Sequence, residues 1–217
     1  MFRFSCNFAI FRREYSVFPK HYIQPTFRKD EQEELLQSED GKKIGHELVK
    51  PALATDTCSD FYDPKVMKFT NVIMRNGNKL LAKKLVTYAF ENVKRIQLQR
   101  YHKATDEEEK EKIELDPVRV FHHALANCTP VLYLKATKKG GITYQVPVPI
   151  ESSKAQHTAM KWLIEATNDK GHEERFYDTL ARVLVATAQN QGGAVRRKHE
   201  LYKKCQEHRA YAHFRWM

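Results

Sequence analysis

The spacing of apolar residues predicts a mainly helical fold after residue 63. Apolar side chains recur there every three or four positions, the period of helices that bury one face. Asp63 followed by Pro64 is a typical helix start, because Asp caps the first turn and Pro fits its backbone geometry. Asn76 followed by Gly77 is a typical helix end, since Gly accepts a left-handed backbone. We expect about six helices, over residues 63–76, 79–100, 116–128, 153–168, 173–191 and 194–209.

Two of these helices have apolar stripes that should face a common core. In the helix over residues 79–100 the expected stripe is Leu81, Leu85, Tyr88, Ala89, Val93 and Ile96. In the helix over residues 153–168 it is Ala155, Thr158, Ala159, Trp162 and Ala166. The outer face of the first of these helices carries Lys83, Lys84, Lys94, Arg95 and Arg100.

Between residues 131 and 150 the period changes to two, which predicts a β-hairpin. Gly140-Gly141 separates the two strands and suits a tight turn. Pro147 and Pro149 lack the amide hydrogen that a central strand needs, so the second strand belongs at an edge. Two strands alone are marginally stable, so we expect the ribbon to be rooted on helices and to project at its tip. The predicted fold class is mainly α, a bundle of about six helices with one protruding two-stranded β-ribbon.

The first 62 residues lack this periodicity and divide into two parts. Residues 1–13 mix aromatic, aliphatic and arginine side chains without an acid, which is typical of a mitochondrial transit peptide. The sequence around Tyr15 resembles a matrix-protease site, so we assign residues 1–15 to a targeting presequence. A disordered basic terminus of a cytosolic or nuclear protein is the alternative. Residues 16–62 are then an extension, acidic from residue 30, with at most one short helix, and residues 63–217 are the folded domain.

Charge indicates the class of partner. The formal net charge is +10 and the isoelectric point about 9.4, which favours a polyanion such as nucleic acid or an anionic membrane surface. The net charge is +9 over residues 64–103, +4 over residues 117–150 and +5 over residues 192–217. No apolar run approaches the ~20 residues that span a bilayer, so no membrane span is expected. Basic blocks that are separate in sequence suggest a shared basic face.

The sequence does not predict catalysis. The chain has 4 cysteines and 10 histidines, but the cysteines are scattered and no zinc-protease, esterase or phosphate-loop motif is present. Neighbouring histidines such as His122 and His123 point in different directions on a helix. A metal-dependent nuclease needs clustered carboxylates, and the acids lie in the segments least expected to pack. We therefore expect no catalytic residue, no metal site and no cofactor.

Two basic segments are candidates for RNA binding. Lys135, Lys138 and Lys139 flank the glycine turn, where lysines can contact phosphates, and the ring of Tyr144 can stack on a base. An ordinary tight turn with solvated lysines is the alternative there. The candidates at the carboxyl end are Arg196, Arg197, Lys198, Tyr211, Arg215 and Trp216. For these the alternative is a solvated basic helix whose terminal aromatic rings dock on the core.

Five segments in order carry a family resemblance. They are KFTNVIM at 68–74, GGITYQVPV at 140–148, AMKW at 159–162, NQGGAVRR at 190–197 and AYAHFRW at 210–216. Together they resemble ribosomal protein seven of the small subunit, in its bacterial type, over about residues 63–216. With the import-like terminus, the chain resembles the mitochondrial form, a structural ribosomal protein and not an enzyme.

The resemblance implies a helical domain whose ribbon arm binds the 3′ major domain of small-subunit rRNA and which nucleates assembly of the subunit head. It also implies neighbouring head proteins as partners and a ribbon near the exit-site tRNA and the mRNA path, in the mitochondrial matrix. Carried over by position, the RNA-binding candidates are Lys68, Arg75, Lys79, Lys135, Lys138, Lys139, Tyr144, Arg196, Arg197, Lys198, Arg215 and Trp216. A free mitochondrial RNA-binding chaperone and an RNA-processing enzyme remain as rival functions.

Three features depart from the family pattern. The acidic segment over residues 30–63 replaces a usually basic run, so a basic protein neighbour could replace an rRNA contact there. The segment Ser152-Ser153-Lys154 lacks an arginine pair that is common at that place. The acidic stretch over residues 104–115 lengthens the loop after the second helix, and rRNA would repel it, so we expect it on the solvent side or against protein.

Overall fold

The computed structural model describes residues 18–19, 21–53, 56–59, 61–169, 171 and 173–216. The predicted presequence over residues 1–15 lies outside these described residues. The chain divides into two compact units, Met1–Pro64 and Lys65–Met217.

The first unit contains two short helices, α1 (Lys29–Gln37) and α2 (Glu39–Ile44), so the prediction of at most one is wrong. Ser38 both ends α1 and starts α2. Its amide donates to the carbonyls of Glu34 and Leu35, and its side chain accepts a hydrogen bond from the amide of Gly41. Because Ser38 caps the end of α1 and the start of α2, the two short helices can follow each other directly. Neither helix needs apolar periodicity for this.

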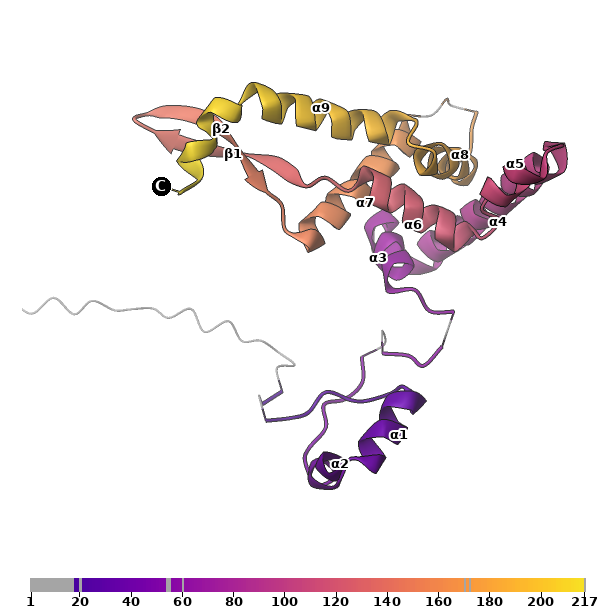
Figure 1. Ribbon diagram of the computed structural model, residues 1–217, viewed down its shortest axis with the longest axis vertical. Coiled ribbons are helices and arrows are strands. Elements are labelled where there is room, and N and C mark those ends of the chain that lie inside the picture. The colour runs from indigo at the N-terminus through magenta and orange to yellow at the C-terminus, as the bar shows by residue number, and fades with distance from the viewer. Residues whose placement is uncertain are drawn as a thin grey trace, which may run out of the picture. The chain divides into compact units, whose positions relative to one another are not determined.

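The second unit is a helical bundle with a β-ribbon, as predicted (Figure 1). Its six main helices are α3 (Pro64–Ile73), α4 (Lys79–Lys103), α6 (Pro117–Cys128), α7 (Ser152–Asn168), α8 (Phe176–Ala188) and α9 (Gly193–Glu207). Helix α8 lies at the centre, since it packs against α4, α6, α7 and α9. The largest buried side chains of the shared core include Phe69, Phe121, Met160, Leu163 and Leu180.

The predicted start of α6 is confirmed by its observed cap, and α4 starts at a cap that was not predicted. The side chain of Asp116 accepts from the amide of Val118 at 3.1 Å, and Pro117 occupies the first turn of α6. The side chain of Asn78 accepts from the amide of Leu81 at 3.1 Å at the start of α4. These bonds satisfy amides that have no partner inside their own helix. Helix α3 ends at Ile73, three residues before the predicted end, and Asn76 with Gly77 forms a left-handed turn after it.

The predicted apolar stripe of α4 is only half correct. Its buried residues are Ala82, Val86, Ala89, Val93 and Gln97. Leu81 is 52% exposed and Tyr88 is 48% exposed. A fixed step of four residues overshoots a full helical turn by about 40°, so Leu81 and Val93 cannot share one face. The observed stripe mixes steps of three and four residues and therefore stays facing α8.

The stripe of α7 shows the same shift by about one residue. Ala155 and Ala159 are buried as expected, whereas Thr158, Trp162 and Ala166 are only half-buried. The deepest positions toward the core are Met160, Leu163 and Thr167, which the sequence interpretation left out. Helix α8 is shorter than predicted at both ends, beginning at Phe176 and ending at Ala188. The acidic stretch, predicted as a loop, contains a further short helix, α5 (Glu107–Lys112).

The ribbon consists of β1 (Leu132–Lys139) and β2 (Ile142–Pro149), paired antiparallel from Leu132 opposite Pro149 to Lys139 opposite Ile142. Gly140 and Gly141 form the two-residue loop, with φ angles of 59° and 83°. Positive φ at both positions is the type I′ turn that matches strand twist, and it strongly favours glycine.

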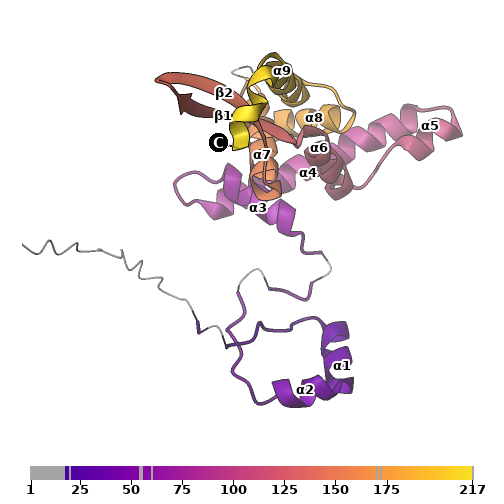
Figure 2. The same ribbon diagram turned by 60° about the vertical axis from the view of Figure 1, so that its left-hand side comes forward.

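The tip of the ribbon is supported on one side, which the sequence did not predict. Helix α9 ends at Glu207, and a 3₁₀ helix, η1 (Arg209–Trp216), continues from it and packs against β2. Figures 1 and 2 show η1 beside the ribbon from two directions. At the root, the amide of Val131 donates to the hydroxyl oxygen of Tyr202 on α9 at 3.1 Å. The carboxyl end of the chain therefore braces the ribbon along its length.

Candidate nucleic-acid interface

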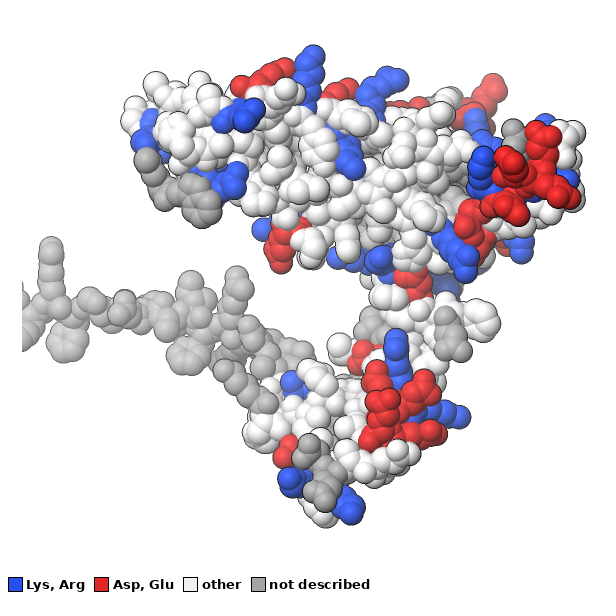
Figure 3. Space-filling model, in the orientation of Figure 1, with Lys and Arg blue, Asp and Glu red and all other residues white. Residues whose placement is uncertain are grey.

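The ribbon carries three exposed lysines near its glycine turn: Lys135, Lys138 and Lys139. Figure 3 shows blue side chains at the ribbon end and along α9. The densest group of red side chains on this unit lies over α5 in that view, and further red side chains stand among the blue ones along α9. The Nζ atom of Lys139 lies 4.3 Å from the ring centroid of Phe214 on η1, a cation–π contact. The turn thus presents cations beside glycines, which lets a phosphate backbone approach closely.

Tyr144 is not an isolated ring at the tip. It is half-buried, and its ring centroid lies 5.0 Å from that of Tyr211 and 5.2 Å from that of Phe214. The guanidinium of Arg215 donates through Nη2 to the carbonyl oxygen of Pro147 at 3.1 Å. These contacts make an aromatic cluster that joins β2 to η1. Tyr211 therefore docks on the ribbon and not on the helical core, whereas the side chain of Trp216 lies outside the described part of the chain.

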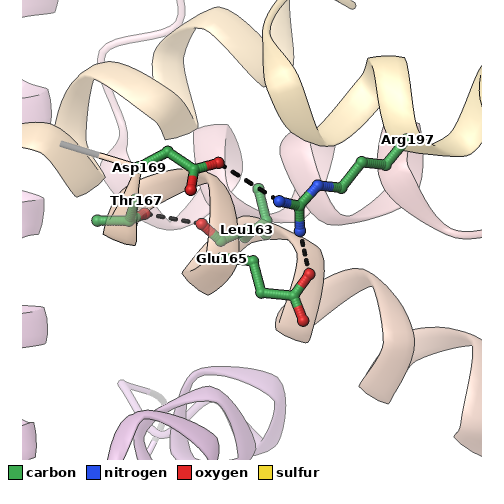
Figure 4. Close-up of polar contacts among 5 residues, drawn as sticks. All are labelled: Leu163, Glu165, Thr167, Asp169 and Arg197. Atoms are coloured by element: carbon green, nitrogen blue, oxygen red, sulfur yellow. Dashed lines mark hydrogen bonds and ion pairs between the residues drawn. The ribbon is translucent and has the colours of Figure 1, made fainter.

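The three consecutive cations near the start of α9 point in different directions. Arg196 is exposed. Arg197 forms ion pairs with Glu165 and, at 3.3 Å, with Asp169, both at the carboxyl end of α7 (Figure 4). The Nζ atom of Lys198 donates to the carbonyl oxygen of Asn127 at 2.7 Å. Successive helix positions are about 100° apart, so a run of cations cannot face one ligand together.

Asn127 organises a junction of three helices that the sequence analysis missed. Its Nδ2 atom donates to the carbonyls of Thr187 at 3.0 Å and Ala188 at 2.9 Å, which are among the last carbonyls of α8. Because Lys198 donates to the carbonyl of Asn127, this asparagine links the ends of α6 and α8 to α9. The three carbonyls that accept these bonds lie at helix ends, where they have no partner within their own helix. An asparagine near a helix end carries no sequence signal for such a role.

Cys128 lies buried beside this junction. Burial raises the pKa of its thiol from 9.0 to about 11, and the nearby charge of Lys198 acts in the opposite direction. Burial also raises the pKa of Cys205 on α9. Both cysteines are therefore protonated packing residues in the core at neutral pH.

The other candidates lie around α3 and the turn after it. Arg75 and Lys79 are exposed on either side of the left-handed Asn76-Gly77 turn. Lys68 is half-buried on α3 and lines a hollow of about 610 Å³ at the root of the ribbon. Other residues around this hollow, which the sequence analysis did not select as RNA-binding, include Tyr133, Lys154, His157 and Trp162.

The described residues contain neither a candidate metal site nor a membrane-spanning helix. No group of three or more His, Cys, Asp or Glu side chains among them could hold a metal ion. Within the same residues, no helix is both long and apolar enough to cross a bilayer.

The described elements of the second unit form a helical bundle with a glycine-turned basic ribbon and a basic helix near the carboxyl end. The family model described as ribosomal protein S7p/S5e matches residues 43–209, and the chain belongs to this family. The resemblance noted from the five motifs is thereby confirmed.

Relatives of this family match nearly the whole chain. Small ribosomal subunit protein uS7m of Danio rerio is 39% identical over 213 residues, covering 93% of this chain and 91% of its own length. The uS7m proteins of Gallus gallus and Drosophila melanogaster are 40% and 37% identical, covering 91% and 93% of this chain and 83% and 90% of their own lengths. The likeness therefore extends well beyond the matched domain.

Proposed function

We propose that this chain is a structural constituent of the mitochondrial small ribosomal subunit and binds its rRNA. The observation that carries the proposal is the family match over residues 43–209, joined to relatives whose name places them in the mitochondrial small subunit. The import-like residues 1–15 agree with that location. The role is binding and assembly, with rRNA and neighbouring ribosomal proteins as partners.

Binding works through cations that hold a folded RNA. Exposed side chains such as Arg75, Lys79, Lys135 and Arg196 neutralise phosphates and release condensed counterions. The proposed target is the 3′ major domain of the small-subunit rRNA, where binding nucleates assembly of the head. Each phosphate contact should add roughly 0.7 to 0.9 to the steepness with which log affinity falls with log salt. An affinity for that rRNA domain that did not change with salt would contradict the proposal.

Sedimentation separates the proposal from its main rival. In a sucrose gradient of mitochondrial lysate at low salt, the chain should travel with the small subunit. A free RNA-binding chaperone would stay near the top of the gradient with unassembled RNA. Deleting residues 1–15 should also keep the protein out of mitochondria. A truncated protein that still reached them would refute the presequence but not the ribosomal role.

The ribbon tip is proposed to lie near the exit-site tRNA and the mRNA path. Lys138 and Lys139 are exposed at the turn, so changing both to Glu reverses charge where those RNAs would pass. We expect translation by the organelle to fall more than head assembly. The matched control reverses the exposed pair Lys83 and Lys84 on α4. Equal loss of assembly and translation would place the ribbon in the rRNA scaffold instead.

A further inference from the structure

We propose that the hollow at the root of the ribbon holds a single unpaired nucleotide of the rRNA. The hollow measures about 610 Å³, within the range of about 300–1,000 Å³ typical of small-molecule sites. Four regions far apart in sequence converge on it: α3, the start of β1, α7 from Ser153 to Trp162, and α9. The inference rests on the proposed function and adds a subsite to it.

The charges around the hollow select an anion. Lys68 on α3 and Lys154 in the first turn of α7 line it, and His157 adds a third nitrogen-bearing side chain. None of the described residues that line it is Asp or Glu. Arg197 and Lys198 of α9, by contrast, contact acceptors within the protein. Lys68 and Lys154 have no ion pair to a carboxylate among the described residues, so their charges are available to phosphates.

The walls of the hollow select a planar base. Tyr133 and Trp162 line it and are both half-buried, so part of each ring remains accessible from the hollow. Leu134, Ile150 and Leu201 complete an apolar wall. Unstacked RNA bases characteristically stack on such rings, at about 1–3 kcal/mol per base. A purely apolar peptide would leave both lysines without a counter-charge, whereas a nucleotide satisfies the rings and the lysines together.

A base that stacks on a ring inside the hollow cannot belong to a duplex. In an A-form duplex both faces of each base are covered by neighbouring bases, so a ring inside a hollow can reach only a base splayed out of a loop, bulge or junction. The hydroxyls of Ser153 and Thr158 line the same space. Each can exchange hydrogen bonds with a base edge, although Thr158 already donates to the carbonyl of Lys154 at 2.8 Å. The ligand is therefore one extruded nucleotide with its flanking phosphates on Lys68 and Lys154.

Tryptophan fluorescence tests the stacking directly, because the chain has only 2 tryptophans, Trp162 and Trp216. The full chain is titrated with a transcript of the 3′ major domain of the mitochondrial small-subunit rRNA. We expect quenching that is reduced in the Trp162→Phe variant, which keeps a ring for stacking but removes the fluorophore. In Tyr133→Leu, one unpaired nucleotide of the bound RNA should become more reactive to 2′-hydroxyl acylation.

Charge variants test the phosphate contacts. The double variant Lys68→Gln, Lys154→Gln should bind more weakly and lower the salt slope by about 2, one for each lost phosphate contact. Lys161→Gln is the matched control, since Lys161 is exposed on the same helix α7 but does not line the hollow. Circular dichroism of each variant checks that it is folded, and the charge variants stand in if Trp162→Phe does not fold.

The outcomes separate the two proposals. If the wild-type chain does not bind the transcript at all, both the proposed function and the subsite are refuted. If it binds, but Trp162→Phe shows the same quenching as wild type and the double lysine variant matches Lys161→Gln, only the subsite is refuted. Reduced quenching in Trp162→Phe together with a lower salt slope in the double lysine variant supports the subsite.

Discussion

The turn of the ribbon and the start of α9 both carry closely spaced basic residues. In the structure, however, these residues differ in whether they contact acceptors within the protein. At the ribbon turn, Lys135 and Lys138 are exposed and make no ion pair among the described residues. At the start of α9, Arg197 pairs with two carboxylates and Lys198 donates to a helix carbonyl. A basic run thus leaves its cations available at the surface only where the tertiary structure offers them no internal acceptor.

The two regions should therefore respond to mutation in opposite ways. Substitutions at the junction of α6, α8 and α9 should lower the free energy of unfolding. Substitutions of Lys135 and Lys138 on the ribbon should leave stability unchanged and weaken RNA binding.

Lys198→Met should destabilise the protein most, by about 2 kcal/mol, because it removes a charged donor from the carbonyl of Asn127 and leaves that acceptor without a partner. Urea unfolding at neutral pH measures the change. The matched control is Lys203→Met, which removes an exposed lysine of the same helix. Equal stability of the two variants would show that the Lys198 contact is dispensable.

Alkaline pH should weaken the same junction through Cys128. Its pKa is raised from 9.0 to about 11, so between these values the unfolded chain loses a proton that the folded chain keeps. The stability linked to this thiol is complete below pH 9 and is lost as the pH approaches 11. From pH 8 to 10, wild type should lose about 1.4 kcal/mol more than Cys128→Ala. Cys58→Ala, at an exposed cysteine, should retain the wild-type pH dependence.

Phe214→Leu should loosen the support of the ribbon by η1, at a cost of about 1 kcal/mol, since it removes a ring from the cluster around Tyr144. It also removes the cation–π contact with Lys139. Hydrogen exchange should become faster for amides of β2, while the core of α8 stays protected. Phe214→Tyr keeps the ring and serves as the control. Unchanged exchange in both variants would show that η1 does not stabilise the ribbon.

The double variant Lys135→Gln, Lys138→Gln should leave the urea midpoint unchanged, because both side chains are exposed. Its salt slope for binding the rRNA domain should fall by about 2. Arg197→Gln provides the opposite pattern, with a lower urea midpoint and little change in slope. If Arg197→Gln altered the slope as much as the ribbon variant, the internal ion pairs would not keep Arg197 from RNA.

The sequence predicted those features of the fold that depend on neighbouring residues. Asp116 with Pro117 marked the start of α6, and Gly140 with Gly141 marked the hairpin turn. These interactions span two or three residues, so local rules of capping and turn geometry suffice. Which face of α4 is buried was harder to predict, because an error of one position replaces the buried Ala82 by the exposed Leu81.

The candidate site was less predictable than the fold. Composition identified the basic and aromatic residues of the site, but not which of their side chains contact other parts of the protein. Trp162 was predicted as part of a core stripe and does pack against the core, but it is only half-buried and also lines the hollow beside Lys68. A sequence pattern gives the direction of a side chain along one helix, whereas a hollow forms only where several helices leave space between them.

The sequence alone therefore determined a helical protein with a glycine-turned ribbon and a strong positive charge, and the resemblance of its five motifs indicated the ribosomal family. Only the tertiary structure decided which cations remain available. The acceptors of Arg197 lie 28 and 32 residues away and that of Lys198 lies 71 residues away. Contacts at such separations exist only after the bundle has packed, because packing brings the ends of α6, α7 and α9 within hydrogen-bonding distance.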